Sequence, residues 1–128
     1  MPDLFEWAAA WLDGQRQAHA THIVTYHRGA LSVEVSATIG RTLFEVDSGA
    51  GVLERIESRD YLIRTADLVL AGNAVFPERG DRIHETQGSQ TFVYEVLAPA
   101  GMGKPPWRYS DPYRRVLRIH TKQVGTLP

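Results

Sequence analysis

The sequence predicts a mainly β fold: a small β-barrel or sandwich of about six to eight strands, preceded by an N-terminal α-helix. Short extended stretches recur along the chain, and glycine-rich turns separate them. One stretch with the helical spacing of apolar residues stands at the front. With 128 residues, the chain is expected to be a single β-barrel domain, residues 1–128, with a helix over residues 3–20 and a long loop over residues 99–114.

The expected helix opens with a capping box. Asp3 can accept hydrogen bonds from the first-turn amides, and Glu6 can reach back three residues to the cap. Large and small apolar side chains then recur at three- and four-residue spacing and form one face, namely Leu4, Trp7, Ala8, Trp11 and Leu12. We expect this face to dock on the protein's own sheet. The alternative is that Trp7 and Trp11 dock on a neighbouring subunit.

The clearest strand of the first half is Leu31–Ile39, in which apolar residues alternate with serine, glutamate and threonine. A strand over His22–Arg28 is expected before it, across a turn that contains Gly29. Gly40 is expected to end the strand, and a separate strand is expected over Thr42–Val46. This part of the chain therefore predicts three short strands.

The extended run Val52–Arg64 predicts a further strand, and its charged middle indicates an exposed edge or a bend near Ser58–Asp60. Thr65–Leu70 is compatible with a single helical turn or with more strand. Pro77–Asp81 predicts a tight turn, in which Gly80 adopts a backbone conformation open chiefly to glycine.

Three strands are expected toward the C-terminus: Arg82–Glu85, Thr91–Leu97 and Arg115–Lys122. In the last of them, Arg118, His120 and Lys122 alternate with apolar residues or threonine, which predicts one buried face and one wet, basic face. Two interpretations stay open. The basic face is either a solvated edge strand protected by charge, or a surface that contacts an acidic partner or DNA.

The loop before the last strand is too long and too polar for a simple turn, and aromatic and basic residues alternate in it. These residues are Trp107, Arg108, Tyr109, Tyr113, Arg114 and Arg115. Residues 104–122 hold six basic residues and one acidic residue, a net charge of +5, in a chain whose net charge is −1. Trp, Tyr and Arg are the usual anchors of a protein interface. We expect a partner or subunit interface; a stacking surface for single-stranded nucleic acid is the alternative.

Catalytic and metal-binding constellations are missing, so neither an enzyme nor a cofactor is expected. The absence of cysteine excludes disulfides and thiolate metal sites. His19, His22 and His27 lack the spacing of a metal site. His84 and His120 lie on separate expected strands, and we expect a surface pair rather than an acid–base couple. Nucleotide-binding and hydrolase motifs do not occur.

The apolar runs are too short for a membrane protein. None approaches the ~18 residues that a spanning helix requires. Asp3 and Glu6 stand where a secretory signal would carry positive charge, so no such signal is expected and no membrane partner either.

Six stretches in a fixed order resemble the head–tail joining proteins of tailed phages and prophages. They are Asp60–Ile63, Ala66–Leu68, Pro77–Ile83, Tyr94–Val96, Trp107–Asp111 and Arg118–Lys122. The resemblance covers about residues 52–125. Its more specific parts are the Pro-x-x-Gly-Asp-x-Ile step at residues 77–83 and the Arg-Ile-His-Thr-Lys ending at residues 118–122.

The resemblance implies a structural, non-enzymatic virion protein. Such a protein is a small β-barrel that assembles into a ring, expected to be a hexamer, in the neck between portal and tail. Its partners would be portal or adaptor proteins and tail terminator or tail tube proteins, with contact to packaged DNA possible and assembly in the host cytoplasm. A tail terminator ring of similar size is one alternative, and a β-barrel module that binds nucleic acid or a ligand is another. The family implies no catalytic residues.

Overall fold

The computed structural model describes residues 21–47, 49, 51–99, 101 and 103–127. The expected helix over residues 3–20, together with Trp7 and Trp11, lies outside the described residues. The described elements are β1 (Thr21–Arg28), β2 (Leu31–Asp47), β3 (Leu53–Arg64), the 3-10 helix η1 (Thr65–Asp67), β4 (Val69–Leu70), β5 (Asn73–Ala74), β6 (Arg82–Gln87), β7 (Gln90–Val96), β8 (Trp107–Tyr109) and β9 (Val116–Leu127).

The mainly β fold predicted from the sequence is confirmed. Seven strands form one antiparallel sheet in the order β3-β2-β1-β6-β7-β9-β8, and β4 and β5 form a separate hairpin. An additional pairing joins β3 to β9. Hydrogen-bonded neighbours therefore run from β3 through β2, β1, β6, β7 and β9 back to β3, and β8 lies outside this circle on the edge of β9.

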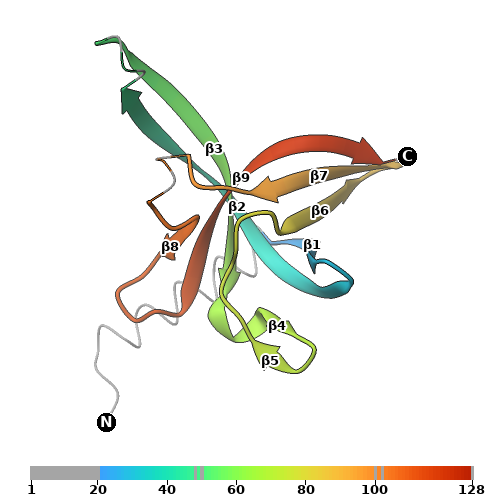
Figure 1. The fold of residues 1–128 in the computed structure, drawn as a ribbon. Helices are drawn as coiled ribbons and strands as arrows, with labels where there is room; N and C mark the ends of the chain where they lie inside the picture. The colour runs from blue at the N-terminus through green and yellow to red at the C-terminus, as the bar shows by residue number, and fades with distance from the viewer. Residues whose placement is uncertain (1–20, 48, 50, 100, 102, 128) are drawn as a thin grey trace.

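The strands cross in a central body and extend from it as hairpins (Figure 1). β2 and β3 leave the body together at the upper left of the view, and β6, β7 and β9 extend to the right. The β4–β5 hairpin projects at the bottom. We call the projecting part of β2–β3, residues 41–57, the arm.

The apolar core lies where the strands cross. Tyr26, Ile63, Ile83, Leu117 and Ile119 are fully buried and come from four different strands. Because the strands are antiparallel and sharply twisted, each one contributes its inward side chains over only part of its length. Beyond the core, β2 and β3 continue together as an exposed hairpin, and the end of β9 continues along β7.

Gly40 does not end a strand, and this expectation was wrong. β2 runs unbroken for 17 residues, and Gly40 pairs with Asp60 of β3 in the middle of it. A Cβ at Gly40 would lie 3.0 Å from Nη1 of Arg118 and 3.2 Å from a methyl of Leu62. The glycine therefore leaves room for the Arg118 guanidinium, so its role is a close approach of chains rather than strand termination.

The charged run of β3 is exposed as far as Glu57 and pairs there with β2 alone, as expected of an exposed edge, but the strand continues through Ser58–Asp60 instead of bending away. Ser58 and Asp60 are buried, and residues 59–64 of β3 pair with β2 or β9, or with both at once. Thr65–Leu70 contains both of the structures left open, a 3-10 turn followed by a short strand. Gly80 has a φ of +90°, so its conformation is the one expected from the turn sequence.

The expected loop over residues 99–114 contains a strand. β8 pairs with Ile119, Arg118 and Leu117 of β9, and Trp107 and Tyr109 pack against the core. As a result β9 is not an edge strand: it pairs with β3 on one side and with β8 and then β7 on the other. It also extends beyond the predicted end, to Leu127.

Candidate partner-binding surface

Three buried carboxylates, Asp60, Asp81 and Glu85, organise the polar interior. Asp60, Asp81 and Glu85 are 0%, 5% and 2% exposed. Each one accepts hydrogen bonds from an arginine and from at least one hydroxyl group of other residues. A buried charge is tolerated only with such partners. The three networks therefore fix which strands meet and how.

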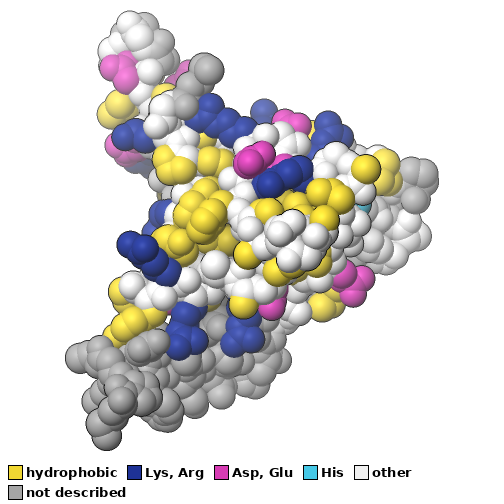
Figure 2. Space-filling view, turned by 60° about the horizontal axis from the view of Figure 1, so that its bottom comes forward, with side chains coloured by type: hydrophobic (Ala, Val, Ile, Leu, Met, Phe, Trp, Pro, Cys, Tyr) yellow, Lys and Arg dark blue, Asp and Glu magenta, His cyan; other side chains and the backbone are white. Residues whose placement is uncertain are grey.

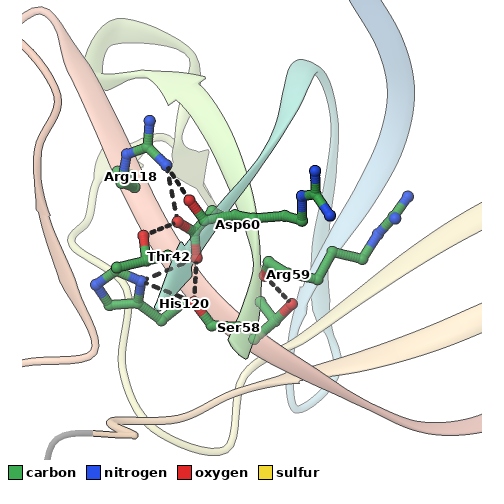
Figure 3. A network of polar contacts seen from close by, with 8 residues as sticks. Thr42, Ser58, Arg59, Asp60, Arg118 and His120 are labelled. Carbon is green, nitrogen blue, oxygen red and sulfur yellow. Dashed lines mark hydrogen bonds and ion pairs between the residues drawn. The ribbon is translucent and has the colours of Figure 1, made fainter. Parts of the chain in front are cut away.

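Asp60 lies at the root of the arm and joins β2, β3 and β9 (Figure 3). Arg118 Nη1 donates to one carboxylate oxygen at 2.8 Å, and Nδ1 of His120 lies 2.9 Å from the other. The Ser58 hydroxyl donates at 2.6 Å, and the Thr42 hydroxyl donates as well. Burial alone would raise the pKa of Asp60, but the hydrogen bonds from His120, Ser58, Thr42 and Arg118 outweigh it and lower the pKa to about 2.

Ser58, His120 and Asp60 have the residue types of a hydrolytic triad but not its geometry. The Ser58 hydroxyl and the Asp60 carboxylate approach the same ring nitrogen, Nδ1 of His120, at 3.4 and 2.9 Å. A triad requires the nucleophile and the carboxylate on opposite nitrogens. Ser58 also donates to Asp60 and is buried. The cluster is therefore a structural joint rather than a nucleophilic site.

Asp81 holds the segment before β6 against β1. It accepts hydrogen bonds from the Tyr26 hydroxyl, from Arg28 Nη2 at 2.8 Å and from the amide of Glu78 at 3.0 Å. Burial, and then the bond to Asp81, raise the pKa of Tyr26. The same Arg28 nitrogen donates to the carbonyl of Phe76 at 2.6 Å. The buried carboxylate thus determines, through Arg28, where the backbone of Phe76 lies.

Glu85 ties two strands that are not neighbours in the sheet. Arg59 of β3 and Tyr61 donate to Glu85 of β6 at 2.9 and 2.8 Å, and Gln87 donates at 2.6 Å. Burial opposes ionisation, but the hydrogen bonds led by Arg59 lower the pKa of Glu85. The Arg59 guanidinium also lies 5.0 Å from the ring centre of Tyr94. This network braces β3 against β6 and β7 across the interior.

Three aromatic rings form a surface beside these networks, which we call the aromatic platform: Phe76, Trp107 and Tyr109. The rings of Phe76 and Trp107 stack at 4.9 Å with 7° between their planes, and Tyr109 meets Trp107 edge-on at 5.0 Å. Arg114 lies 5.6 Å from the centre of the Tyr109 ring. Phe76 remains 50% exposed. An exposed, well-positioned ring next to cations is typical of a protein-binding anchor.

The predicted interface residues of this region fall into two groups, half-buried aromatic side chains and exposed arginines. Trp107 and Tyr109 are half-buried on β8, Arg108 points outward between them, and Arg114 and Arg115 are exposed. Tyr113 is half-buried and lies in a turn, where its backbone amide donates a hydrogen bond to the Asp111 carboxylate. Sequence reasoning missed Phe76, because a single phenylalanine after β5 carries no signal until Trp107 is found beside it.

The basic residues of β9 do not form the wet face that alternation predicted. His120 is buried, and Arg118 turns toward Asp60, so only Lys122 is exposed. The expected pairing of His84 with His120 was also wrong. His84 instead meets His27 of β1, with ring centres 4.1 Å apart, because β6 pairs with β1 and not with β9.

The described surface also has a shallow hollow next to the 3-10 helix η1. The hollow has a volume of about 580 Å³ and is lined by Arg64, Thr65, Ala66, Asp67, Ala74, Arg114 and Arg115. Among the described residues, no group of three or more His, Asp or Glu side chains could hold a metal, and no helix is long and apolar enough to span a membrane. One face gathers hydrophobic side chains in its middle, with Lys or Arg side chains beside them (Figure 2).

Comparison with known proteins agrees with the resemblance seen in the sequence. No curated protein matches the chain significantly. A family model described as "Phage head-tail joining protein" matches residues 2–128. Because the match covers nearly the whole chain, including β1, β2 and the arm, the protein belongs to the phage head–tail joining family.

Proposed function

We propose that this protein forms a ring in the neck of a tailed phage or prophage, where it joins the portal or adaptor to the tail and closes the DNA channel. Membership of the joining family supports a structural role at the head–tail junction and a location in the virion. The ring, its closure of the channel and the absence of enzymatic activity are the parts that we add. The family match over residues 2–128 is the observation that carries the proposal.

The body is proposed to be a small β-barrel, on which a ring can be built. The pairing of β3 with both β2 and β9 supports closure, since it leaves β8 as the strand outside the circle. A closed sheet has no long free edges at which copies would aggregate. Contacts between copies would then fall on the arm and on the surface around β8.

The aromatic platform is the surface that we propose for partner contact, with Trp107, Tyr109, Arg108, Tyr113, Arg114 and Arg115 as its central and flanking residues. The chain Asp81–Arg28–Phe76 supports this assignment, because it holds the platform in place before any partner arrives. A preorganised surface loses less conformational entropy on binding. Whether Trp7 and Trp11 serve the same interface stays a prediction.

Contact with packaged DNA is a separate part of the proposal. Of the three β9 residues that the sequence suggested, Arg118 and His120 are engaged by Asp60. Lys122 is exposed and is left as the β9 residue able to reach a phosphate. A channel-lining role therefore has to rest on Lys122 together with residues outside β9.

Labelled particles test the location. An epitope label inserted in the exposed turn between β6 and β7, at Gly88–Ser89, leaves the body and the platform intact. Electron micrographs of a lysate should show the label at the necks of complete particles and on filled heads that lack tails. Label on free tails instead would indicate the tail terminator. Label on neither, with affinity for free oligonucleotide, would favour the nucleic-acid module.

A further inference from the structure

We propose that the arm of one copy docks on the aromatic platform of the next copy. This proposal deepens the ring proposed above and rests on it. It assigns the two surfaces that meet and makes them different surfaces of the same chain. Contacts of that kind are heterologous, and they close into a ring when the rotation between copies permits it.

The arm carries apolar side chains that its own sheet does not cover. Leu43, Leu53 and Val52 are 66%, 63% and 59% exposed, and Ile56 is 37% exposed. Leu43 and Leu53 lie on the same face, because Leu43 pairs with Glu57 and Leu53 with Asp47 in the β2–β3 register. Apolar side chains gathered at the end of a projecting hairpin mark an interaction site. The aromatic platform, with Phe76 half-exposed, offers an apolar surface of matching chemistry.

The charges around the two surfaces are opposite. The arm, residues 41–57, has four acidic residues and two basic ones, a net charge of −2. The segments that carry and flank the platform, residues 76–79 and 101–115, have five basic residues and two acidic ones, a net charge of +3. Complementary fields favour encounter between these surfaces over encounter between two arms or two platforms. This complementarity is the reason for choosing a second copy as the occupant.

Both surfaces are held in place before they meet. The arm is anchored at its root by Asp60, which links β2, β3 and β9. The platform is anchored by Arg28, and Arg79 donates to the carbonyls of Gly101 and Lys104 in the neighbouring loop. The arm strands β2 and β3 extend away from the body (Figure 1). The arm is therefore free to reach a platform in another copy.

Cysteine cross-linking tests the contact, because the chain has no cysteine of its own. Leu53→Cys is placed in one preparation and Phe76→Cys in another, and the two are mixed under mild oxidation. Ser89→Cys, in the exposed β6–β7 turn, is the matched control. All three side chains are exposed, so each variant should keep the circular dichroism spectrum of the parent. Docking raises the effective concentration of the two thiols, so the 53–76 disulfide should form about tenfold faster than the 53–89 disulfide.

The alternatives give different products. Faster formation of 53–53 than of 53–76 would mean that arms pair symmetrically, and a 53–76 rate equal to the control would mean that the arm does not dock on the platform. Raising the salt concentration from about 0.05 M to about 0.5 M should slow the 53–76 reaction, because the charges are screened. A rate indifferent to salt would remove the argument for this occupant. None of these cross-linking results would contradict the proposed location in the phage neck, because the labelled particles test that location separately.

Discussion

β8 and β9 lie side by side and both carry arginine, yet they use it in opposite ways. Arg108 of β8 and Arg118 of β9 are paired in the register. Arg118 reaches the buried carboxylate of Asp60 at 2.8 Å, whereas Arg108 is exposed. β9 pairs on both sides and contacts the buried Asp60 carboxylate through Arg118 and His120, whereas β8 is the last strand in the described sheet and pairs with β9. The same residue type thus stabilises the fold on one strand and is exposed on the next.

The largest effect should come from removing the anion that distinguishes β9. Asp60→Ala leaves Arg118 and His120 without their buried partner, which should lower the free energy of unfolding by about 3–5 kcal/mol. Urea unfolding at pH 7 measures it. Glu57→Ala is the control, since Glu57 meets Arg41 in an exposed pair at 3.4 Å, and its loss should cost about 0–1 kcal/mol. Equal costs for the two variants would contradict the distinction between buried and exposed pairs.

Acid should weaken the same joint. Asp60 has a folded-state pKa of about 2, below the value of 3.8 expected in the unfolded chain. Its contribution is therefore fully present above pH 3.8 and is lost as the pH falls toward 2, by about 2 kcal/mol. Glu85, whose pKa is also lowered, adds loss in the same direction. Between pH 5 and pH 2, the free energy of unfolding should fall less for Asp60→Asn than for the parent. An equal fall in both proteins would contradict the stabilising role of the Asp60 carboxylate.

Trp107→Ala separates the two roles within β8 itself. Sequence reasoning placed this side chain in a long loop, but Trp107 lies on β8, packs against the core and stacks on Phe76. Because the ring is only partly buried, the change should cost about 2 kcal/mol, less than for a fully buried tryptophan. Phe76→Ala, at the exposed end of the same stack, should cost about 1 kcal/mol or less. Thermal unfolding of both variants measures which change costs more stability. A larger loss for Phe76→Ala would mean that Phe76, and not Trp107, contributes more to the core.

Arg108→Ala should give the smallest change in stability. The side chain is exposed, so the free energy of unfolding should stay within about 0.5 kcal/mol of the parent. Arg118→Ala, the matched change on the neighbouring strand, should be clearly destabilising because it leaves Asp60 without its arginine. Denaturant midpoints of the two variants compare the strands directly, and similar midpoints would mean that β8 and β9 do not differ as described.

The fold class and most strands could be predicted, because alternation such as that of Leu31–Ile39 reflects burial on one face. The same rule failed at His120, since β9 has Asp60 behind it on the face that alternation marks as wet. It failed again at Gly40, where the reason for glycine is the distant Arg118. Both errors come from partners about 60 or more positions away along the chain, which local patterns do not contain.

The aromatic part of the candidate surface was predicted in composition but not in structure. Trp107 and Tyr109 were identified, whereas their strand and their partner Phe76 were not. Phe76 is recognised as part of the surface only from its stacking on Trp107, and Arg28 fixes its backbone carbonyl. The family resemblance was carried by local motifs such as the one at residues 77–83, and the family match confirms it.

The central claim is that the surface around β8 serves partners, whereas β9 serves the fold. Its most direct test is the double variant Phe76→Ala/Arg108→Ala, supplied in place of the parent protein during phage growth, with heads and tails counted in electron micrographs. We expect a soluble, folded protein, filled heads without tails, and leaked DNA. A normal yield of complete, infectious particles from this variant would contradict it.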